Sequence, residues 1–466
     1  MLANTECVCT AARRFWRSSA WGAVVGAALL FLGSAAWAQG ADPNAPALRL
    51  IKLIPINGTA GAPATKMYSF DISFVDPKNG LYYLADRSNK ALDVIDTTGA
   101  FTGTADTLYG QIGGAGPGQA NFAGFVACNP PAGANDCAGP DGVAADFPCI
   151  FAGDGNSRLL SFNGNVNFSQ VITALKTGGT TRVDEMAVDT ADGLVFAINN
   201  AETPPFGTIA TYSKSTCALS NPIKVTFNNA TAGAEQPSFD PVTKAFYVSI
   251  PEIGGGGTNH TGAVVQVTTG GTIQATFPIN FCGPAGSTAG PNGDLLIGCN
   301  TVYDTSGKAC LAVTQVKGPA VANTASPAMC TGIAFPQVAI CNPGRGCTPS
   351  NGSLVSVPGP GGGDEVWFNS GDSNYYVTGG NNPIGPTLGV VASGASTTGT
   401  PNTLVQQIPT LPPQAAVSGV QPVGTVHSVA ASAANNHVYV PLPANTDYNF
   451  NGVGCAQGCI AVFSAQ

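Results

Sequence analysis

The sequence predicts an all-β protein built from about seven copies of one small unit, and three observations lead to this fold class. Charged residues are only 9% of the 466 residues, whereas Gly and Pro number 60 and 35. Such a composition is typical of many short strands joined by turns. An acidic residue, an alternating strand, a turn and an apolar strand recur about every 40 to 50 residues, which indicates stacked repeats. One isolated strand also precedes the first unit, and the last unit has three strands.

The clearest copy of the unit spans residues 68–101. An alternating stretch that begins near Asp71 predicts the first strand, and Asp76-Pro77-Lys78-Asn79-Gly80 predicts a tight turn. Leu81–Asp86 and Ala91–Asp96 then predict the second and third strands. Six further units are expected in residues 139–162, 182–212, 235–267, 283–299, 364–377 and 427–463. The pattern does not assign the outer strands of the fifth unit, and insertions are expected near 106–138 and in 317–363.

The isolated strand predicts how the repeats close. Residues 48–56 alternate as a strand but have no hairpin partner nearby, and the last unit lacks a fourth strand. Pairing residues 48–56 outside Ile460–Phe463 completes that unit and removes a raw sheet edge. A linear solenoid would need polar caps instead. The sequence therefore predicts one domain over 48–466, a seven-bladed β-propeller whose N-terminal strand completes the C-terminal blade.

The N-terminus has the features of an export signal. Three arginines, Arg13, Arg14 and Arg17, precede an apolar run, Ala20–Gly33, that is short for a membrane span. Ala36-Trp37-Ala38 is a small-x-small cleavage site. We therefore expect a signal peptide over 1–38, a linker over 39–47 and a bacterial periplasmic or secreted protein with no later membrane span. An uncleaved anchor helix is the alternative, and the choice between general and twin-arginine export stays open.

Twelve cysteines remain after the leader, and an even number in an exported chain indicates disulfides. The candidate pairs either bracket short loops or lie on successive expected strands. They are Cys128 with Cys137, Cys282 with Cys299, Cys341 with Cys347, and Cys455 with Cys459. A zinc site is disfavoured because the sequence contains no Cys-x-x-Cys pair.

Two stretches resemble known repeat families. Leu84 to Val94, with Ala85-Asp86-Arg87-Ser88-Asn89, resembles the blade of NHL repeats, and His427 to Pro441 resembles the YVTN-type propeller repeat. The wider class includes SMP-30/gluconolactonase-like propellers and a lyase of the streptogramin-inactivating kind. The resemblance implies the propeller fold over most of residues 48–466. It does not imply one activity, because propellers host both binding proteins and enzymes.

Aligning the units places polar side chains at one mouth of the expected central channel. The aligned position lies five residues before the end of each first strand and is acidic or imidazole in six of the seven units. In chain order its residues are Asp71, Asp141, Asp184, Glu235, Ala285, Asp364 and His427. The ends of the second strands, at Asp86, Asp154, Asn199, Glu252 and Asn300, are expected at the same face.

So many carboxylates in one ring suggest a cation site. Two carboxylates about 6 Å apart repel by roughly 3 kcal/mol at an effective dielectric constant near 20. They must therefore be solvated, share protons or hold a cation. Asp71, Asp184, Glu235 and Asp364 are the candidate metal ligands, and their oxygen atoms favour Ca²⁺ or Mg²⁺. The alternative is that these acids hydrogen-bond backbone amides and line a wet channel.

These features narrow the function without fixing it. The formal charge of −8 disfavours a nucleic-acid partner. The first hypothesis is a binding or scaffold protein that holds a protein or small-molecule ligand on its loop faces. The alternative is a divalent-metal-assisted hydrolase or lactonase at the acidic channel mouth, with His427 or Glu235 as the base.

Overall fold

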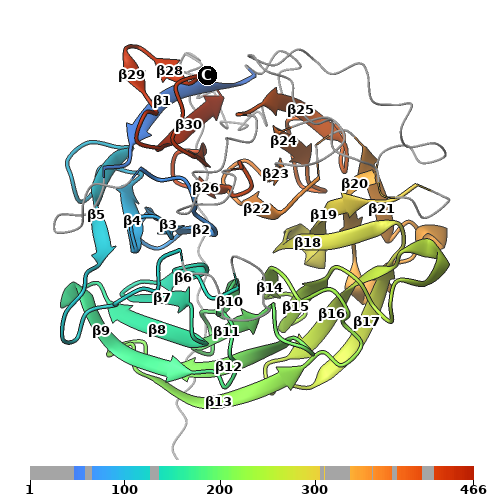
Figure 1. Cartoon of the computed structure of the whole chain (residues 1–466). Helices are drawn as coiled ribbons and strands as arrows, with labels where there is room; N and C mark the ends of the chain where they lie inside the picture. The colour runs from blue at the N-terminus through green and yellow to red at the C-terminus, as the bar shows by residue number, and fades with distance from the viewer. Residues whose placement is uncertain are drawn as a thin grey trace, which may run out of the picture. The chain divides into compact units, whose positions relative to one another are not determined.

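The computed structural model describes residues 47–57, 66–125, 136–304, 309, 336–358, 360, 362–379, 386–411 and 425–465. The described residues of the compact unit Ala41–Gln466 form seven four-stranded antiparallel sheets. These sheets are the blades of a seven-bladed β-propeller, and the innermost strand of each blade faces the centre of the ring (Figure 1). The predicted fold class is confirmed. The leader and nearly all of the linker lie outside the described residues.

The first four blades follow one another along the chain, each running from its innermost to its outermost strand. Blade 1 consists of β2 (Ser73–Asp76), β3 (Leu81–Asp86), β4 (Ala91–Asp96) and β5 (Thr107–Gly113). Blade 2 consists of β6 (Val143–Asp146), β7 (Cys149–Asp154), β8 (Arg158–Asn163) and β9 (Asn167–Lys176). Blade 3 consists of β10 (Met186–Asp189), β11 (Leu194–Asn199), β12 (Phe206–Tyr212) and β13 (Leu219–Thr226). Blade 4 consists of β14 (Pro237–Asp240), β15 (Ala245–Ile250), β16 (Gly262–Thr268) and β17 (Ile273–Ile279).

The last three blades complete the ring. Blade 5 consists of β18 (Cys282–Ala289), β19 (Leu295–Val302), β20 (Pro336–Cys341) and β21 (Leu354–Pro358). Blade 6 consists of β22 (Glu365–Asn369), β23 (Asn374–Gly379), β24 (Thr387–Ala392) and β25 (Leu404–Pro409). Blade 7 consists of β26 (Ala430–Ser432), β27 (His437–Leu442), β30 (Cys459–Ala465) and β1 (Leu48–Pro55).

Short elements connect some of these strands. A two-stranded hairpin, β28 (Asn449–Phe450) and β29 (Val453–Gly454), extends between β27 and β30. The described residues also form single-turn 3-10 helices, namely η1 (Gly257–Asn259), η2 (Pro291–Gly293), η4 (Pro343–Arg345) and η5 (Pro349–Asn351). Among the described residues, no helix has the length and apolar character that crossing a bilayer requires.

The second strand of most blades is apolar at nearly every position because both faces of a blade are buried there. Leu81, Tyr83 and Ala85 of β3 pack against blade 2. The alternate residues of the same strand, Tyr82 and Leu84, pack against blade 7. Successive side chains of a strand point to opposite faces, so one strand contributes to two interfaces. The described core divides into seven such clusters, one at each interface between neighbouring blades.

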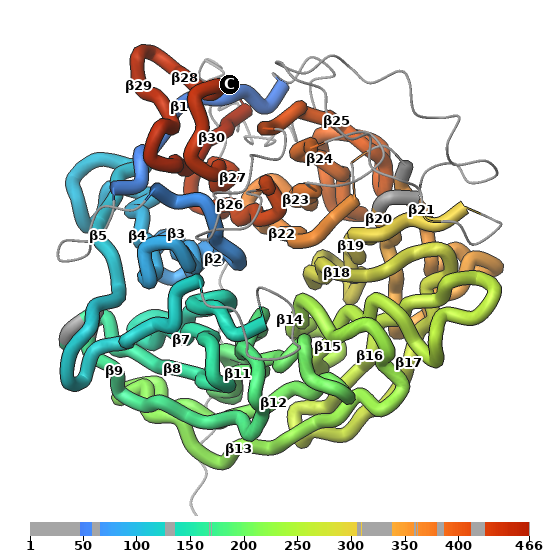
Figure 2. The backbone as a smooth tube through the Cα atoms, viewed as in Figure 1, coloured from blue at the N-terminus to red at the C-terminus, as the bar shows by residue number. Residues whose placement is uncertain are grey.

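The two ends of the propeller domain share one sheet, as predicted. Strand β1 pairs antiparallel with β30, in a register that places Leu50 opposite Phe463 and Ile54 opposite Ile460. Figure 2 shows β1, the first described strand, running beside β30 at the closure of the ring. Leu53 packs into the interface of blades 6 and 7, whereas Ile54 packs into that of blades 7 and 1. The closing strand therefore contributes core to both neighbouring interfaces.

The aspartate that ends several inner strands fixes the following turn. One carboxylate oxygen of Asp76, Asp189 and Asp240 accepts a hydrogen bond from the backbone N–H two residues further on, at 2.8, 3.0 and 2.9 Å. This is the side-chain turn that aspartate commonly forms. The second oxygen of Asp76 accepts from the backbone N–H of Phe147 at 2.7 Å, which also joins blade 1 to blade 2.

Segments expected as insertions contribute strands. Strands β20 and β21 lie within 317–363, the segment expected to be an insertion, and supply the outer half of blade 5. Strand β5 similarly lies within 106–138. The repeat pattern missed β20 and β21 because a stretch of more than thirty residues separates β19 from β20.

Four disulfides join described cysteines. Three of them, Cys282–Cys299, Cys341–Cys347 and Cys455–Cys459, were predicted from the sequence. The fourth, Cys149–Cys217, ties the start of β7 in blade 2 to the turn between β12 and β13 in blade 3. Its 68-residue separation hid it from a search for local pairs. Cys128 lies outside the described residues, so the pair Cys128–Cys137 stays a prediction.

The inter-blade disulfide is expected to stabilise the fold more than a local one. Loop-closure entropy gives about 4 kcal/mol for a separation of 68 residues and about 2 kcal/mol for a separation of 4. Replacing Cys149 and Cys217 with serine should therefore lower the free energy of unfolding about twice as much as replacing Cys455 and Cys459. Urea unfolding of the two double variants measures the difference. Equal losses would contradict the entropic account.

Candidate functional site

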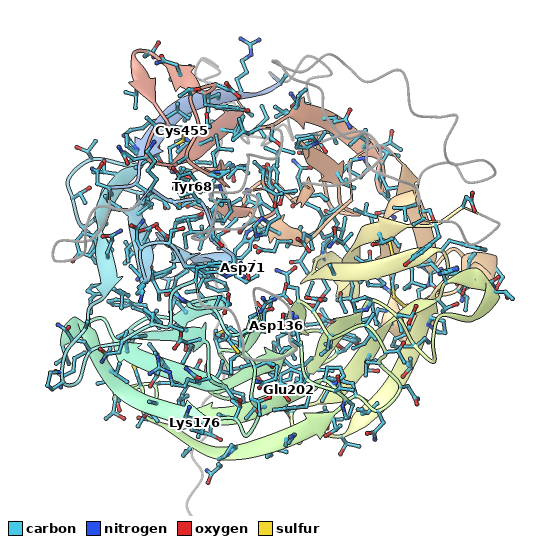
Figure 3. The ribbon with its side chains drawn as sticks, in the orientation of Figure 1. Tyr68, Asp71, Asp136, Lys176, Glu202 and Cys455 are labelled. Atoms are coloured by element: carbon cyan, nitrogen blue, oxygen red, sulfur yellow. A yellow bond between two sulfur atoms is a disulfide. The ribbon has the colours of Figure 1, made fainter. Side chains whose placement is uncertain are left out.

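The predicted channel-mouth residues lie just before, or at the start of, the inner strands. Asp71 lies beside the centre of the ring, whereas Lys176 of β9 lies at the periphery (Figure 3). Asp141, Asp184, Glu235 and Asp364 precede β6, β10, β14 and β22 in the same way, and His427 precedes β26. Because inner strands of neighbouring blades contact one another, their preceding residues gather at one end of the channel.

A buried arginine joins the first two acids. The guanidinium of Arg87, which follows β3, forms ion pairs with Asp71 of blade 1 and Asp141 of blade 2. Arg87 is 4% exposed and Asp141 is fully buried. Burial raises the pKa of Asp141 to about 6, although the charges of Arg87 and Arg182 oppose this shift. The bridge therefore compensates charge that would otherwise be costly to bury.

A second buried arginine, Arg182, forms an ion pair with the acid of blade 3, Asp184. Arg182 and Asp184 form an ion pair with a guanidinium nitrogen 2.6 Å from a carboxylate oxygen. Burial opposes the charge of Arg182, but the carboxylates of Asp184, Asp141 and Glu235 raise its pKa above its usual value. Arg182 therefore remains charged and holds part of the acidic ring in its ionised form.

The acids of blades 4 and 6 have no such ion pair among the described residues. Burial, together with the charges of Asp184 and Asp364, raises the pKa of Glu235 to about 8 against the opposing effect of Arg182. Burial also raises the pKa of Asp364. One oxygen of Asp364 accepts a hydrogen bond from the Asn300 side-chain amide at 3.1 Å. Near neutral pH a proton therefore occupies Glu235 most of the time.

His427 is held in one orientation between blade 7 and blade 1. Its Nε2 lies 3.2 Å from Oδ1 of Asp71, and its Nδ1 lies 3.0 Å from the backbone carbonyl oxygen of Thr425. The imidazole stacks on the ring of Phe70 with the centroids 5.1 Å apart and the planes nearly parallel. Three contacts thus fix the ring, so that Nε2 points to Asp71.

The alignment of the units missed several charged residues of the mouth. Glu185 and Glu365 directly follow two of the predicted acids and are 5% and 1% exposed. Burial raises the pKa of Glu365 to about 8, while His427 in its protonated form and a hydrogen bond from Ser428 oppose it. The sequence does contain a feature that marks these residues and the two arginines, Arg87 and Arg182. In a chain with only 9% charged residues, each lies within two residues of a predicted acid or strand end.

The channel mouth has more acceptors than donors. Within the described part of the chain, four carboxylates each keep one buried oxygen without a hydrogen-bond partner. These oxygens are Oδ2 of Asp141, Oδ1 of Asp184, Oε2 of Glu185 and Oε1 of Glu365. Buried polar groups in native proteins are nearly always satisfied. The site is therefore suited to a ligand that carries positive charge or several hydrogen-bond donors.

A polar cavity lies beside the one aligned position that is neither acidic nor histidine, Ala285. Ala285 of blade 5 occupies the position that is acidic or imidazole in the other blades, and its short side chain lines a cavity of about 280 Å³. The residues that line this cavity also include Glu235, Glu252, Asn300, Thr301 and Tyr303. Its volume falls just below the range of 300 to 1,000 Å³ that is typical for drug-sized ligands. It therefore suits a compact polar molecule.

The walls of the cavity carry acids and one aromatic ring. Glu252 is held by the hydroxyl of Thr231, which donates to Oε1 at 2.7 Å. The ring of Tyr303 stacks on His260 with the centroids 4.4 Å apart. Burial and the nearby charge of Glu252 raise the pKa of Tyr303, so its hydroxyl keeps its proton near neutral pH. Carboxylates and an aromatic ring line one small cavity, and both kinds of group attract cations.

The ends of the second strands divide into two groups. Glu252 and Asn300 line the cavity, as described above. Asp86, Asp154 and Asn199 are instead fully buried in hydrogen bonds with Asn89, Arg158 and Thr177. These last three support the blades and do not contribute to the cavity.

The predicted metal ligands do not gather as expected from the alignment. Among the described residues, the acidic and histidine side chains close enough to share an ion are Asp71, Glu365 and His427, whose ligand atoms lie within 4.8 Å of one another. Of the four carboxylates predicted as ligands, only Asp71 belongs to this group. Asp184 is engaged by Arg182 instead, and Asp364 by Asn300.

Comparison with known proteins supports the architecture. No protein-family model and no curated protein sequence matches the chain. A solved chain of Kuenenia stuttgartiensis Hydrazine Synthase is similar over 87% of this chain and 98% of its own length, with a TM-score of 0.52 and 10% identity. A chain of a Mitotic Checkpoint Complex is similar over 96% of this chain and 98% of its own, with a TM-score of 0.50 and 9% identity. At such low identities the likeness shows the fold alone: the chain is a seven-bladed β-propeller.

Proposed function

We propose that this protein is an exported binding protein that holds a compact organic cation, such as a quaternary ammonium group, in the cavity beside Ala285. The observation that carries the proposal is the lining of this cavity, with Glu235, Glu252 and Tyr303 around about 280 Å³. An aromatic face and nearby carboxylates are the groups with which proteins recognise quaternary ammonium ligands.

Binding is favoured over the hydrolase alternative by the ion pairs at the mouth. A Ca²⁺ or Mg²⁺ shared by Asp71, Asp184, Glu235 and Asp364 would compete with Arg87 for the first and with Arg182 for the second. A resident arginine already supplies the positive charge there. The cavity beside Ala285 is free of both arginines among its lining residues.

Export is part of the proposal and rests on the leader and the cysteines. Disulfides such as Cys149–Cys217 form and persist in oxidising compartments. We propose cleavage after Ala38, which gives a mature protein that starts at Gln39. The kinship with NHL and YVTN repeats is likewise proposed, from the stretches at 84–94 and 427–441.

Calorimetric titration with choline tests the function. Choline is expected to bind with one site per chain, and its uncharged carbon isostere, in which a tert-butyl group replaces the trimethylammonium, is expected to bind at least tenfold more weakly. The isostere keeps the size and removes the charge, so it isolates the electrostatic contribution. Equal affinity for the two ligands, or no binding of choline, would rule the proposal out.

The affinity for choline should rise with pH up to about 8. Glu235 has a pKa of about 8 without ligand and must lose its proton to attract a cation. Below that pH the affinity should fall by up to about tenfold per pH unit, because binding releases a proton. Choline itself does not titrate, and the groups near Glu235 include Asp184, Glu185, Asp364, Arg182 and Asn200.

Glu235→Gln provides the matched control for this pH profile. The variant keeps the size of the side chain and removes the titrating group. Its affinity should be low and should vary much less between pH 6 and pH 8 than that of the parent protein. A pH profile that is the same with and without Glu235 would show that another group controls binding.

A further inference from the structure

We propose that Asp71, Glu365 and His427 form a binding site for one divalent transition-metal ion at the junction of blades 6, 7 and 1. The three residues come from three consecutive blades around the ring: Glu365 begins β22, His427 precedes β26 and Asp71 precedes β2. Their ligand atoms lie within 4.8 Å of one another. The site is separate from the cavity beside Ala285 and does not depend on the function proposed for it.

The geometry of His427 is that of a metal ligand. Its Nδ1 lies 3.0 Å from the carbonyl oxygen of Thr425 and 3.2 Å from the hydroxyl oxygen of the same residue, and a proton on Nδ1 suits both contacts because the carbonyl can only accept. Metal-bound histidines typically donate their second ring N–H to a backbone carbonyl or a carboxylate in this way. The neutral ring then presents the lone pair of Nε2 to Oδ1 of Asp71 at 3.2 Å. Two acceptor atoms at this separation repel unless a proton or a cation lies between them.

The two carboxylates are each oriented by one oxygen and offer the other. Oδ2 of Asp71 is engaged by Arg87, which leaves Oδ1 facing His427. Oε2 of Glu365 accepts from the hydroxyl of Ser428 at 2.5 Å and from the backbone N–H of Ser73. Oε1 of Glu365 is buried and has no hydrogen-bond partner in the described part of the chain.

This unpartnered oxygen favours a metal ion over a shared proton. A proton between Nε2 of His427 and Oδ1 of Asp71 would satisfy those two atoms and leave Oε1 of Glu365 unpaired in a side chain that is 1% exposed. The ligand atoms of the three residues lie within 4.8 Å of one another, and a small shift of one side chain would bring them within reach of one ion, since two ligands about 2.1 Å from an ion lie at most about 4.2 Å apart. Two ligands at right angles on an ion at about 2.1 Å lie about 3.0 Å apart, close to the 3.2 Å between Nε2 and Oδ1.

The donor set selects the kind of ion. One imidazole nitrogen and two carboxylate oxygens favour first-row transition-metal ions such as Zn²⁺ or Mn²⁺, because Ca²⁺ and Mg²⁺ prefer all-oxygen sites. Glu365 and Asp71 each contribute a negative charge next to the divalent ion, and Asp71 shares its charge with Arg87. Three protein ligands also leave coordination positions open for water or an exogenous ligand.

The test uses the full mature chain without a histidine tag, stripped with chelator, dialysed and titrated calorimetrically with Zn²⁺ and Mn²⁺. We expect one ion per chain, and a higher melting temperature with the ion than without. His427→Gln and Glu365→Gln should each weaken the affinity at least 100-fold. Choline binding should stay unchanged in His427→Gln, which separates failure of this site from failure of the proposed function.

His437→Gln is the matched control. His437, the first residue of β27, also faces a carboxylate, because its Nδ1 lies 3.0 Å from Oδ2 of Asp106. It lies outside the group formed by Asp71, Glu365 and His427. Its replacement should leave metal affinity unchanged. If a ligand variant does not fold, Co²⁺ bound to the parent chain should show visible bands of nitrogen and oxygen coordination without sulfur charge transfer. No binding of Zn²⁺, Mn²⁺ or Co²⁺, or unchanged affinity in folded His427→Gln, would overturn the proposal.

Discussion

Replacing Leu53 and Ile54 with alanine is expected to destabilise the protein by about 4 to 8 kcal/mol. Each side chain is at most 4% exposed, and each packs into a different inter-blade interface. Truncating a buried Leu or Ile to Ala costs about 2 to 5 kcal/mol, and the two losses should nearly add because the side chains share no interface. The total approaches the whole stability of many domains.

Urea unfolding followed by near-ultraviolet circular dichroism measures this loss. Arg49→Ala on the same strand is the control, because Arg49 is exposed and pairs in the same ladder. It should change the free energy of unfolding by less than about 0.5 kcal/mol. A double alanine variant within 1 kcal/mol of the parent, on the scale of a typical single substitution, would show that β1 does not close the ring.

Replacing Arg87 with methionine is expected to cost about 3 to 5 kcal/mol at neutral pH. The substitution keeps the length of the side chain but leaves Asp71 and Asp141 without the cation that joins them. Breaking a buried ion pair by removing one partner typically has an effect of this size. The loss should shrink toward pH 5, because burial already raises the pKa of Asp141 to about 6 against the opposing charge of Arg87, and without Arg87 this carboxyl takes up a proton.

A second substitution distinguishes lost charge from lost packing. Adding Asp141→Asn to Arg87→Met removes the buried charge that the first change leaves uncompensated. The double variant should be more stable than Arg87→Met alone, with a coupling energy of about 0.5 to 3 kcal/mol in the mutant cycle. Simple additivity of the two losses would mean that Arg87 acts only through its packing.

The fold was predictable because its features repeat in the sequence. Strands buried on both faces read as apolar runs such as Leu81–Asp86, and the aspartates at Asp76, Asp189 and Asp240 mark the turns because their side chains make them. The orphan strand 48–56 revealed the closure because a four-stranded blade must be completed. The outer strands of blade 5 could not be predicted in this way, because a long stretch of sequence separates β19 from β20.

The site was only partly predictable because its contacts cross between blades. The alignment placed Asp71 and His427 at the channel mouth, and the structure brings these two together. It did not predict that Arg87, from the end of a second strand, reaches the acid of the next blade. Such contacts depend on how neighbouring sheets are rotated about the axis. The only sign of the cavity in the sequence was the alanine at position 285, where the other units have an acid or a histidine.

The most direct test of the proposed binding site is the affinity of Ala285→Leu for choline. Ala285 is 3% exposed and lines the cavity, so a leucine at this position fills the space without changing any charge. If the cation binds there, calorimetry will show choline binding lost in a variant whose circular dichroism matches the parent. If Ala285→Leu binds choline as tightly as the parent protein does, the ligand site lies elsewhere and the account is wrong.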